Sequence, residues 1–262
     1  MTTTIALAGK GGVGKTTVAA MVIKYLAQTQ TGPILAIDAD PSSNLNMALG
    51  LELAWTVGDI REDMLAQVKQ SLTRGGAAMG TLPGGITKRE HLDYQIRSSV
   101  AEGARFDLIA MGRSEGPGCY CAVNHNLREV VDDISKHYRY VVIDNEAGME
   151  HLSRRTTRDV QYLLVISDPT QRGLVAAQRI AAFRHELDIR IEQTYLILNL
   201  LRTEPIPEPL RASIEMLGIP LLGAIPYSSD VSDVESDGRA VVDMGDDSPV
   251  YQAVAEMLQR IL

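Results

Sequence analysis

Residues 9–17 read Gly-Lys-Gly-Gly-Val-Gly-Lys-Thr-Thr and directly follow a short apolar run over 3–8. The segment matches the phosphate-binding pattern Gly-x-x-x-x-Gly-Lys-Thr, which joins a β-strand to the helix after it. Its glycines let successive backbone N–H groups converge on one anion, and the N-terminus of the next helix strengthens the attraction. The chain is therefore predicted to begin with a strand, a phosphate-binding loop and a helix over 15–28.

Beyond this loop, short apolar runs alternate with longer segments of helical periodicity. Several runs are apolar at consecutive positions, as strands buried on both faces of a sheet require. We expect strands at 3–8, 34–38, 106–111, 140–144, 162–167, 194–200 and 221–225, and helices at 15–28, 124–137, 171–187, 207–217 and 249–262. This order predicts an α/β fold with a mostly parallel central sheet of about seven or eight strands and helices on both faces.

No repeat or linker divides the sequence, so residues 1–262 are predicted to form a single domain of the P-loop ATPase type. The least regular stretch runs from Leu72 to Gly103 and contains Gly-Gly and Pro-Gly-Gly turns. We expect it to be a long surface excursion.

Composition excludes several classes of protein. With 45% hydrophobic residues in a chain of 262, the sequence can build its own core and is neither disordered nor a disulfide scaffold. A formal net charge of −8 opposes nonspecific binding to DNA or anionic lipid. No apolar stretch approaches the ~20 residues of a membrane span, and the N-terminus lacks a signal-peptide core. We expect a cytoplasmic protein with no membrane and no nucleic-acid partner.

Each residue of the loop is predicted to contribute to a nucleotide site. Lys15 reaches the β- and γ-phosphates, and the Thr16 hydroxyl ligates Mg²⁺. A glycine-rich turn with a purely structural role would not need this Lys-Thr pair. The residues expected to bind the phosphates are Gly9, Lys10, Gly11, Gly12, Val13, Gly14, Lys15, Thr16 and Thr17.

The second lysine of the loop, Lys10, makes it resemble the deviant Walker A motif of the MinD, ParA and nitrogenase iron protein group. This resemblance implies a homodimer with two ATP molecules at its interface, in which Lys10 reaches the phosphates bound by the partner. A cation delivered in this way acts as an arginine finger does. Lys10 and Lys15 are then both catalytic. The alternative is that Lys10 is a solvated surface lysine.

Carboxylates follow two of the predicted strands, in Ile-Asp-Ala-Asp-Pro over 37–41 and Val-Val-Ile-Asp over 141–144. Ligands of open α/β sheets gather at these strand ends. By the same resemblance, Asp38 and Asp144 lie near the magnesium, Asp40 orients or activates the attacking water, and Glu146 and Gly148 belong to a switch that senses the γ-phosphate. Alternatively, Asp38 and Asp40 only cap the next helix.

The identity of the base is predicted from two other strand ends. Asn199 closes the strand over 194–200, and Pro226 and Tyr227 follow the strand over 221–225. In the resembled group, these positions contact adenine. No guanine-recognition motif follows the strand, so ATP is favoured over GTP. An asparagine that merely caps the strand end is the alternative.

The two cysteines, Cys119 and Cys121, lie in Gly-Pro-Gly-Cys-Tyr-Cys. Two thiolates are half of a tetrahedral set, and a symmetric dimer meeting at this loop would supply four, enough for Zn²⁺, Ni²⁺ or Cu(I). His125 could add a ligand but is more often a surface residue. Ordinary reduced thiols and a redox pair are the alternatives, although redox pairs usually have the spacing Cys-x-x-Cys.

Together with the loop, the motifs Gly-Pro-Gly-Cys-Tyr-Cys-Ala and Asp-Asn-Glu-Ala-Gly-Met-Glu-His-Leu resemble the CooC family of nickel-dependent carbon monoxide dehydrogenase accessory ATPases. The related acetyl-CoA synthase maturation ATPases are equally close. Asn145 departs from the expected switch sequence at a position we expect to vary.

The resemblance implies an ATP-hydrolysing metallochaperone that dimerises with nucleotide, holds Ni²⁺ or Zn²⁺ through the shared cysteines and serves carbon monoxide dehydrogenase or acetyl-CoA synthase as client. The alternative is a MinD- or ParA-like positioning ATPase without a metal role. Residues 250–262 contain one Arg and one Glu, unlike the basic amphipathic helix of MinD proteins. A third alternative is electron transfer, as in the nitrogenase iron protein, whose cluster ligands come from separate loops.

Overall fold

The computed structural model describes residues 2–73, 87–113, 121–147, 159–183 and 189–262. These ranges contain an eight-stranded sheet in the order β3-β4-β2-β5-β1-β6-β7-β8. All strand pairs are parallel except β3 with β4. The strands are β1 (Thr3–Gly9), β2 (Ile34–Asp38), β3 (Ala101–Glu102), β4 (Phe106–Ala110), β5 (Tyr140–Ala147), β6 (Asp159–Ser167), β7 (Arg190–Leu201) and β8 (Leu221–Pro226). The structure confirms the predicted α/β fold.

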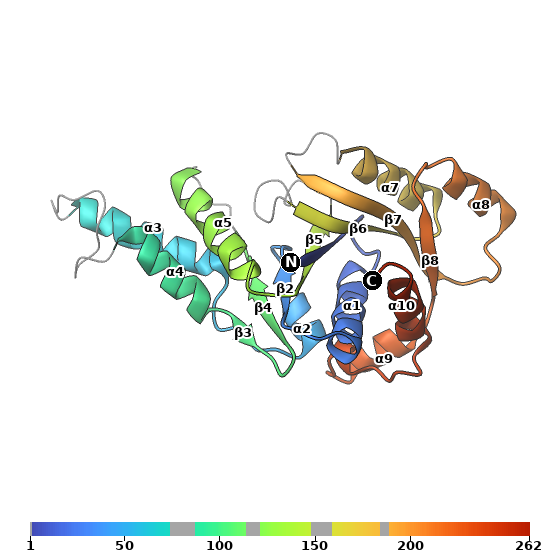
Figure 1. The fold of residues 1–262 in the computed structure, drawn as a ribbon, viewed down its shortest axis with the longest axis horizontal. Helices are drawn as coiled ribbons and strands as arrows, with labels where there is room; N and C mark the ends of the chain where they lie inside the picture. The colour runs from blue at the N-terminus through green and yellow to red at the C-terminus, as the bar shows by residue number, and fades with distance from the viewer. Residues whose placement is uncertain (1, 74–86, 114–120, 148–158, 184–188) are drawn as a thin grey trace.

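Helices cover both faces of this sheet (Figure 1). They are α1 (Lys15–Thr29), α2 (Leu45–Leu49), α3 (Val57–Thr73), α4 (Lys88–Ser98), α5 (Cys121–Ser135), α7 (Gln171–Phe183), α8 (Glu208–Glu215), α9 (Asp230–Ser236) and α10 (Pro249–Gln259), with a short 3₁₀ turn, η1 (Val241–Asp243). Each of the five predicted helices is confirmed, with shifted ends. Among the described ranges, none of the helices combines the length and the apolar character of a membrane span.

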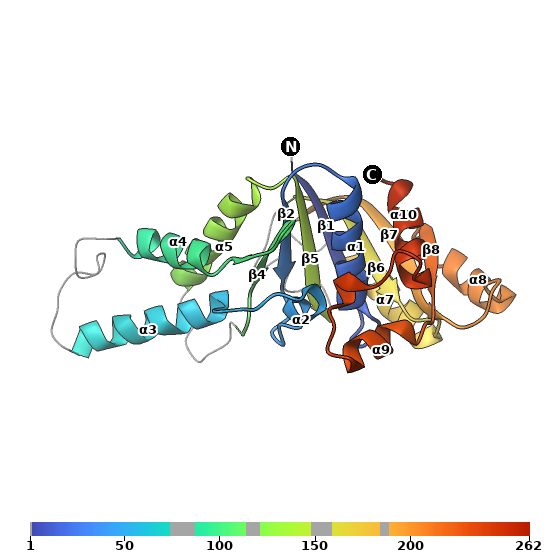
Figure 2. The ribbon, with the colours of Figure 1, turned by 90° about the horizontal axis from the view of Figure 1, so that it is seen from below.

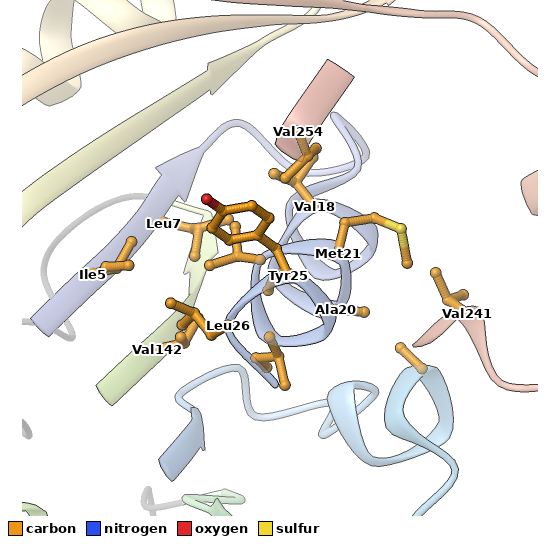
Figure 3. Packing of buried hydrophobic residues seen from close by; sticks show 14 of the residues in the cluster. Ile5, Leu7, Val18, Ala20, Met21, Tyr25, Leu26, Val142, Val241 and Val254 are labelled. Atoms are coloured by element: carbon orange, nitrogen blue, oxygen red, sulfur yellow. The ribbon is translucent and has the colours of Figure 1, made fainter. Parts of the chain in front are cut away.

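Strand β1 shows how a continuous apolar run builds two cores. Ile5 and Leu7 point to the face covered by α1 and α10, where they pack with Leu26 (Figure 3). Ala6 and Ala8 point to the opposite face, which is covered by α5 and α7. Because β1 lies inside the sheet and is buried on both faces, the loop that follows it starts from a fixed position.

Helices α3 and α4 form a helical arm that extends beyond the β3 edge of the sheet (Figure 2). Part of this arm lies in the stretch 72–103, which the sequence predicts to be a surface excursion without regular elements. An arm beyond the sheet edge agrees with an excursion, but residues 87–102 contain α4 and β3 and so are not irregular. Thr87 caps α4: its hydroxyl accepts from the Glu90 N–H at 3.2 Å, and the Glu90 carboxylate accepts from the Thr87 N–H at 2.9 Å. The sequence signature of this capping box is Thr-x-x-Glu at 87–90, which marks the start of α4.

The segment from η1 to α10 is anchored to α1 by one lysine. Lys24 is 8% exposed and donates to the Met244 carbonyl. It also pairs with Asp246 Oδ1 at 2.9 Å, and its ammonium lies 4.9 Å from the centre of the Tyr251 ring. The Tyr251 hydroxyl in turn donates to Gln28, one turn further along α1. The second half of the helix that begins at the phosphate-binding loop is thus held by the C-terminal segment, and Figure 1 shows α1 and α10 side by side.

Candidate nucleotide site

The predicted phosphate-binding loop joins the carboxyl end of β1 to the N-terminus of α1. Gly14 precedes the first residue of α1 and has φ 86° and ψ 27°, a left-handed conformation that strongly favours glycine. Gly12 also has a positive φ, 79°. Val13 between them is buried and anchors the loop to the core. The glycine spacing that identified the motif therefore corresponds to a backbone that few other residues could adopt.

The two lysines of the loop occupy different surroundings. Lys15 is 8% exposed, and its Nζ donates to the Lys10 carbonyl at 3.4 Å, so its charge lies over the loop itself. The Lys10 side chain is exposed and lines an open hollow of about 560 Å³. The other residues around this hollow belong to α7: Gln171, Arg172, Val175, Ala176, Arg179 and Ile180. Lys15 is placed to act on a nucleotide in its own loop, whereas Lys10 is accessible to a second molecule.

Asp144 lies on β5 beside the start of α1. Its Oδ2 accepts a hydrogen bond from the Thr16 hydroxyl at 2.6 Å, while its Oδ1 is buried and has no hydrogen-bond partner. The side chain is 1% exposed. Burial, and next the negative charge of Asp38, raise its pKa to about 7, although the Thr16 hydrogen bond acts in the opposite direction. One oxygen of the carboxylate is therefore buried and without a hydrogen-bond partner, while the positive charge of Lys15 lowers the pKa in part.

Asp38 is the register partner of Asp144 on the neighbouring strand β2. It is fully buried, and its two oxygens accept from the backbone N–H groups of Asp40 at 3.0 Å and Leu45 at 2.9 Å. Burial raises its pKa to about 6, and these two hydrogen bonds only partly offset the rise. Asp38 accepts from the N–H of Leu45, the first residue of α2. Asp38 therefore also caps this helix, as the alternative interpretation predicts.

Asp40 is half-buried, and its Oδ1 accepts from the N–H and the hydroxyl of Ser42 at 2.8 and 2.6 Å. The Asp40 carboxylate is thus hydrogen-bonded within its own turn. The Asp40 backbone N–H donates to the Asp38 carboxylate, so a hydrogen bond links these two residues within the loop after β2. The chain places Asp40 at the rim of the site rather than in its buried part.

The oxygen donors in this region fit Mg²⁺. Thr16, Asp38 and Asp144 offer a hydroxyl and two carboxylates, the hard ligands that Mg²⁺ prefers, and the unpartnered Asp144 Oδ1 is an available donor atom. In the described part of the chain, no group of three or more His, Cys, Asp or Glu could hold a metal ion unaided. A magnesium ion here would need phosphate and water oxygens as well, which is how Mg²⁺ is usually bound beside a nucleotide.

On the other side of the loop, Asn199 is 5% exposed and donates from Nδ2 to the Val13 carbonyl at 2.7 Å. The residue predicted to contact adenine therefore contacts the phosphate-binding loop. The Tyr227 N–H donates to the Leu201 carbonyl at 2.7 Å, which brings the ends of β7 and β8 together. The Arg202 guanidinium lies 3.8 Å from the centre of the Tyr227 ring.

Pro226 is half-buried at the end of β8, and Tyr227 is 45% exposed, so both remain accessible to a planar ligand. Leu200, between the predicted base contacts, has φ 61°, an unusual value for a residue with a branched side chain. Such strained backbone positions cluster at functional sites. Neither Arg202 nor Leu200 can be predicted from a local motif, because neither the stacking nor the backbone strain depends on local residue types.

Asn145, which was expected only to vary, is also part of the site. It is 1% exposed, and its Nδ2 donates to the Leu7 carbonyl at 2.8 Å, two residues before the loop begins. Its Oδ1 is buried without a hydrogen-bond partner. Asn145 thus ties β5 to β1 at the entrance to the loop. The sequence signal for this role is an asparagine that directly follows the aspartate at the end of a predicted buried strand.

Several predicted residues cannot be placed. Cys119 and Gly148 lie outside the described residues, and of Cys121 the structure describes only its position as the first residue of α5. The side chain of His125 is likewise outside the description. Glu146 is half-buried near the end of β5. The predicted thiolate metal site therefore stays a prediction.

Comparison with known proteins gives a consistent result. The family model described as "CobQ/CobB/MinD/ParA nucleotide binding domain" matches residues 4–241. An uncharacterized ATP-binding protein of Methanocaldococcus jannaschii is 40% identical over 258 residues, 98% of each chain. The carbon monoxide dehydrogenase accessory protein CooC of Rhodospirillum rubrum is 27% identical over 98% of this chain and 95% of its own. The MinD cell division protein of Aquifex aeolicus superposes with a TM-score of 0.68 at 20% identity, covering 99% of this chain and 96% of that one.

Proposed function

The chain belongs to the CobQ/CobB/MinD/ParA nucleotide-binding family, and on this premise we propose that it hydrolyses ATP to control a homodimer that carries a metal ion to a client metalloenzyme. Residues 1–262 act as one ATPase domain in this proposal. The observation that carries the ATPase part is the hydrogen bond from Thr16 to the buried Asp144, which keeps an unpartnered oxygen, directly beside Lys15. An anion-binding loop next to two buried carboxylates is an arrangement for a metal-bound nucleotide.

The roles of the residues follow from their positions. Backbone N–H groups of the loop and the Lys15 ammonium bind the phosphates, while Thr16, Asp38 and Asp144 hold Mg²⁺. The ion, when bound, neutralises charge on the β- and γ-phosphate oxygens. Asp40, at the rim, orients the attacking water once Ser42 releases its carboxylate.

Lys10 acts in the second protomer in this proposal. Its side chain is exposed beside α7 and has no described role in its own loop. In a homodimer closed on ATP, it would approach the partner's γ-phosphate and stabilise charge that develops there during hydrolysis. Hydrolysis then depends on dimerisation, so the rate of ATP hydrolysis sets how long the dimer lasts.

The metal-carrying part rests on Cys119 and Cys121 and on the similarity to CooC. Two copies of the chain supply four thiolates, a complete tetrahedral set for Zn²⁺ or Ni²⁺ as cargo. The client proposed is carbon monoxide dehydrogenase or acetyl-CoA synthase. ATP closure and hydrolysis would change the separation of the two cysteine loops and so the affinity for the metal.

An anaerobic titration of the reduced protein with Ni²⁺ or Zn²⁺, with and without Mg·ATP, tests this part. Metal content and molecular mass are measured together for the wild type and for Cys121→Ser. We expect about one metal per two chains, as tetrahedral thiolate coordination by a dimer requires, and its loss in the variant. The variant should still bind ATP and dimerise, which separates the metal site from the nucleotide site. Metal binding that survives Cys121→Ser, or ATP-driven dimers that bind no metal, would refute the metallochaperone role.

The MinD-like alternative, positioning on a membrane, finds no support in α10. This helix buries Val250, Val254 and Met257 against the core. An interfacial helix would instead present its apolar face to lipid. We therefore propose no membrane partner, and the formal net charge of −8 gives no reason to propose a nucleic-acid partner.

A further inference from the structure

Asn199 reaches the phosphate-binding loop from a strand that does not adjoin it. In the sheet, β6 lies between β1 and β7, yet the Asn199 side chain crosses to the Val13 carbonyl and donates to it at 2.7 Å. The residue is 5% exposed, and Val13 is 1% exposed, so the hydrogen bond is shielded from water. A carbonyl can only accept, which fixes the amide nitrogen as the atom that faces it.

The adjoining residue of the loop is packed against the same amide. A Cβ atom at Gly14 would lie 2.5 Å from Asn199 Nδ2, closer than any real contact. Gly14 therefore has two reasons to lack a side chain, its φ of 86° and the presence of this amide. The contact between Asn199 and the loop is close-packed as well as hydrogen-bonded.

Orienting the Val13 carbonyl also orients the next N–H group. In a trans peptide, the C=O and N–H of one unit point in opposite directions. With the Val13 oxygen held toward Asn199, the Gly14 N–H is directed away from Asn199. Phosphate-binding loops work by presenting such N–H groups to an anion before it arrives.

We propose that Asn199 is a positioning residue for the phosphate-binding loop, which fixes the Val13–Gly14 peptide so that its N–H group faces the phosphates whatever base the nucleotide carries. This inference rests on the proposed nucleotide function and deepens it. One N–H of the Asn199 amide is then engaged by the loop, while its second N–H and its Oδ1 remain for the adenine contact that the family resemblance implies. Tyr227 and Arg202 lie at the neighbouring strand ends as further base contacts.

A base-free ligand separates the two roles of Asn199. Binding of ATP and of inorganic tripolyphosphate, each with Mg²⁺, is measured by calorimetry for the wild type and for Asn199→Asp. The carboxylate has the shape of the amide but no N–H, and it places negative charge against a carbonyl oxygen. We expect both affinities to fall, each by about tenfold or more, the effect of losing one buried hydrogen bond and leaving its partner unsatisfied.

Asn46→Asp is the matched control, because Asn46 Nδ2 donates to the Leu51 carbonyl at 3.3 Å in the same way but in α2. It should leave both affinities unchanged. Lys15→Ala shows that tripolyphosphate occupies the loop, since it should abolish that binding. Circular dichroism and thermal melting report whether Asn199→Asp folds, and Asn199→Ala replaces it if it does not.

A variant that binds ATP more weakly but tripolyphosphate as tightly as the wild type would overturn the proposal and return Asn199 to a base contact. Unchanged binding of both ligands would overturn it too. If tripolyphosphate binding falls in Asn199→Asp but the wild type hydrolyses no ATP, the ATPase function is refuted and the positioning role of Asn199 stands.

Discussion

The strand ends on the two sides of β1 differ in whether they bury ionisable side chains. Toward β5 and β2 the polar side chains are carboxylates, Asp144 and Asp38, both buried and with pKa values raised to about 7 and about 6. Toward β6 and β7 they are the neutral groups of Ser167 and Asn199, which are as deeply buried. Asn199 and Ser167 each donate to a backbone carbonyl of this chain.

The difference indicates which side awaits a ligand. A buried carboxylate with an unpartnered oxygen is stabilised by a nearby cation, whereas a buried amide that donates to the loop already has a hydrogen-bond partner in the protein. We infer that the carboxylate side, β5 and β2, is built for the metal and the reacting phosphate. The amide side, β6 and β7, holds the shape of the loop in advance.

Asp144→Asn should have the largest effect of these substitutions. It should lower the rate of ATP hydrolysis and raise the stability of the folded protein. Hydrolysis of ATP should fall by about 100- to 1000-fold, the range seen when one electrostatic contributor to a reaction is removed. The nucleotide-free protein should become more stable at pH 8, on the order of 2 kcal/mol, because a buried charge without a cation is gone. Steady-state phosphate release and urea unfolding measure the two effects.

The matched control for this substitution is Asp168→Asn on the amide side. Asp168 is half-buried just after β6, and its Oδ1 accepts from the Thr170 N–H at 3.2 Å. Hydrolysis should change by less than about twofold, since this carboxylate is a local turn residue. Equal losses of activity in the two variants would remove the contrast between the two sides.

The second prediction concerns pH and uses the protein free of magnesium and nucleotide. Asp38 and Asp144 have folded-state pKa values of about 6 and about 7, above the ordinary value of 3.8, so the folded state binds more protons between those limits. The stability that they contribute is complete below pH 3.8 and is lost as the pH rises through about 7. Groups whose pKa is lowered, such as Asp246, titrate below this window.

Urea unfolding at several pH values from 5 to 8.5 measures this slope, which should lie on the order of 1 kcal/mol per pH unit. The slope should become shallower in Asp144→Asn. Saturating Mg·ATP should make the slope of stability against pH shallower, because a cation favours the ionised carboxylates. A slope that Asp144→Asn leaves unaltered would mean that this carboxylate is already ionised in the free protein.

The third prediction compares the two lysines of the loop. Lys10→Ala should slow hydrolysis at least about tenfold while ATP affinity changes by less than about threefold, because an exposed cation that acts in the partner contributes to the reaction and little to binding. Lys15→Ala should instead weaken binding itself. Single-turnover hydrolysis and equilibrium binding measure the two constants separately. If Lys10→Ala and Lys15→Ala lower ATP affinity alike, Lys10 acts within its own loop.

The smallest expected effect lies at the base-facing end of the amide side. Arg202→Ala removes the guanidinium over the Tyr227 ring and should weaken ATP binding about two- to fivefold, the value of an exposed cation–π contact. Tripolyphosphate affinity should not change. Tyr227→Phe keeps the ring and serves as the control. A loss of tripolyphosphate binding in Arg202→Ala would mean that Arg202 contacts phosphate.

The sequence was sufficient for features that local chemistry decides. Gly12 and Gly14 mark the loop because their positive φ angles require glycine, and the apolar runs mark the buried strands. The amphipathic pattern of α4 was obscured by its polar composition, and only the Thr87 capping box announced it. Strand β3 has two residues, too few for any pattern.

The candidate site divides in the same way. Lys15, Thr16 and the two strand-end aspartates could be named because each motif carries its own chemistry. The partner of Asn199 could not, because the bond to Val13 joins residues that are 186 positions apart. The same holds for Asn145 and Leu7, which meet only when β5 pairs with β1. The sequence thus names candidate reacting groups, whereas the contacts of the Asn145 and Asn199 amides emerge only from the fold.

The Lys24 anchor has a mechanical consequence. Because Lys24 and Gln28 tie α1 to the C-terminal segment, the helix that carries the phosphate-binding loop is cross-braced at its far end. The chain after β2 has a different link to the site, since Asp38 accepts from the first N–H of α2. We expect a ligand at the Asp38 carboxylate to act first on α2, from which the chain continues to the arm of α3 and α4.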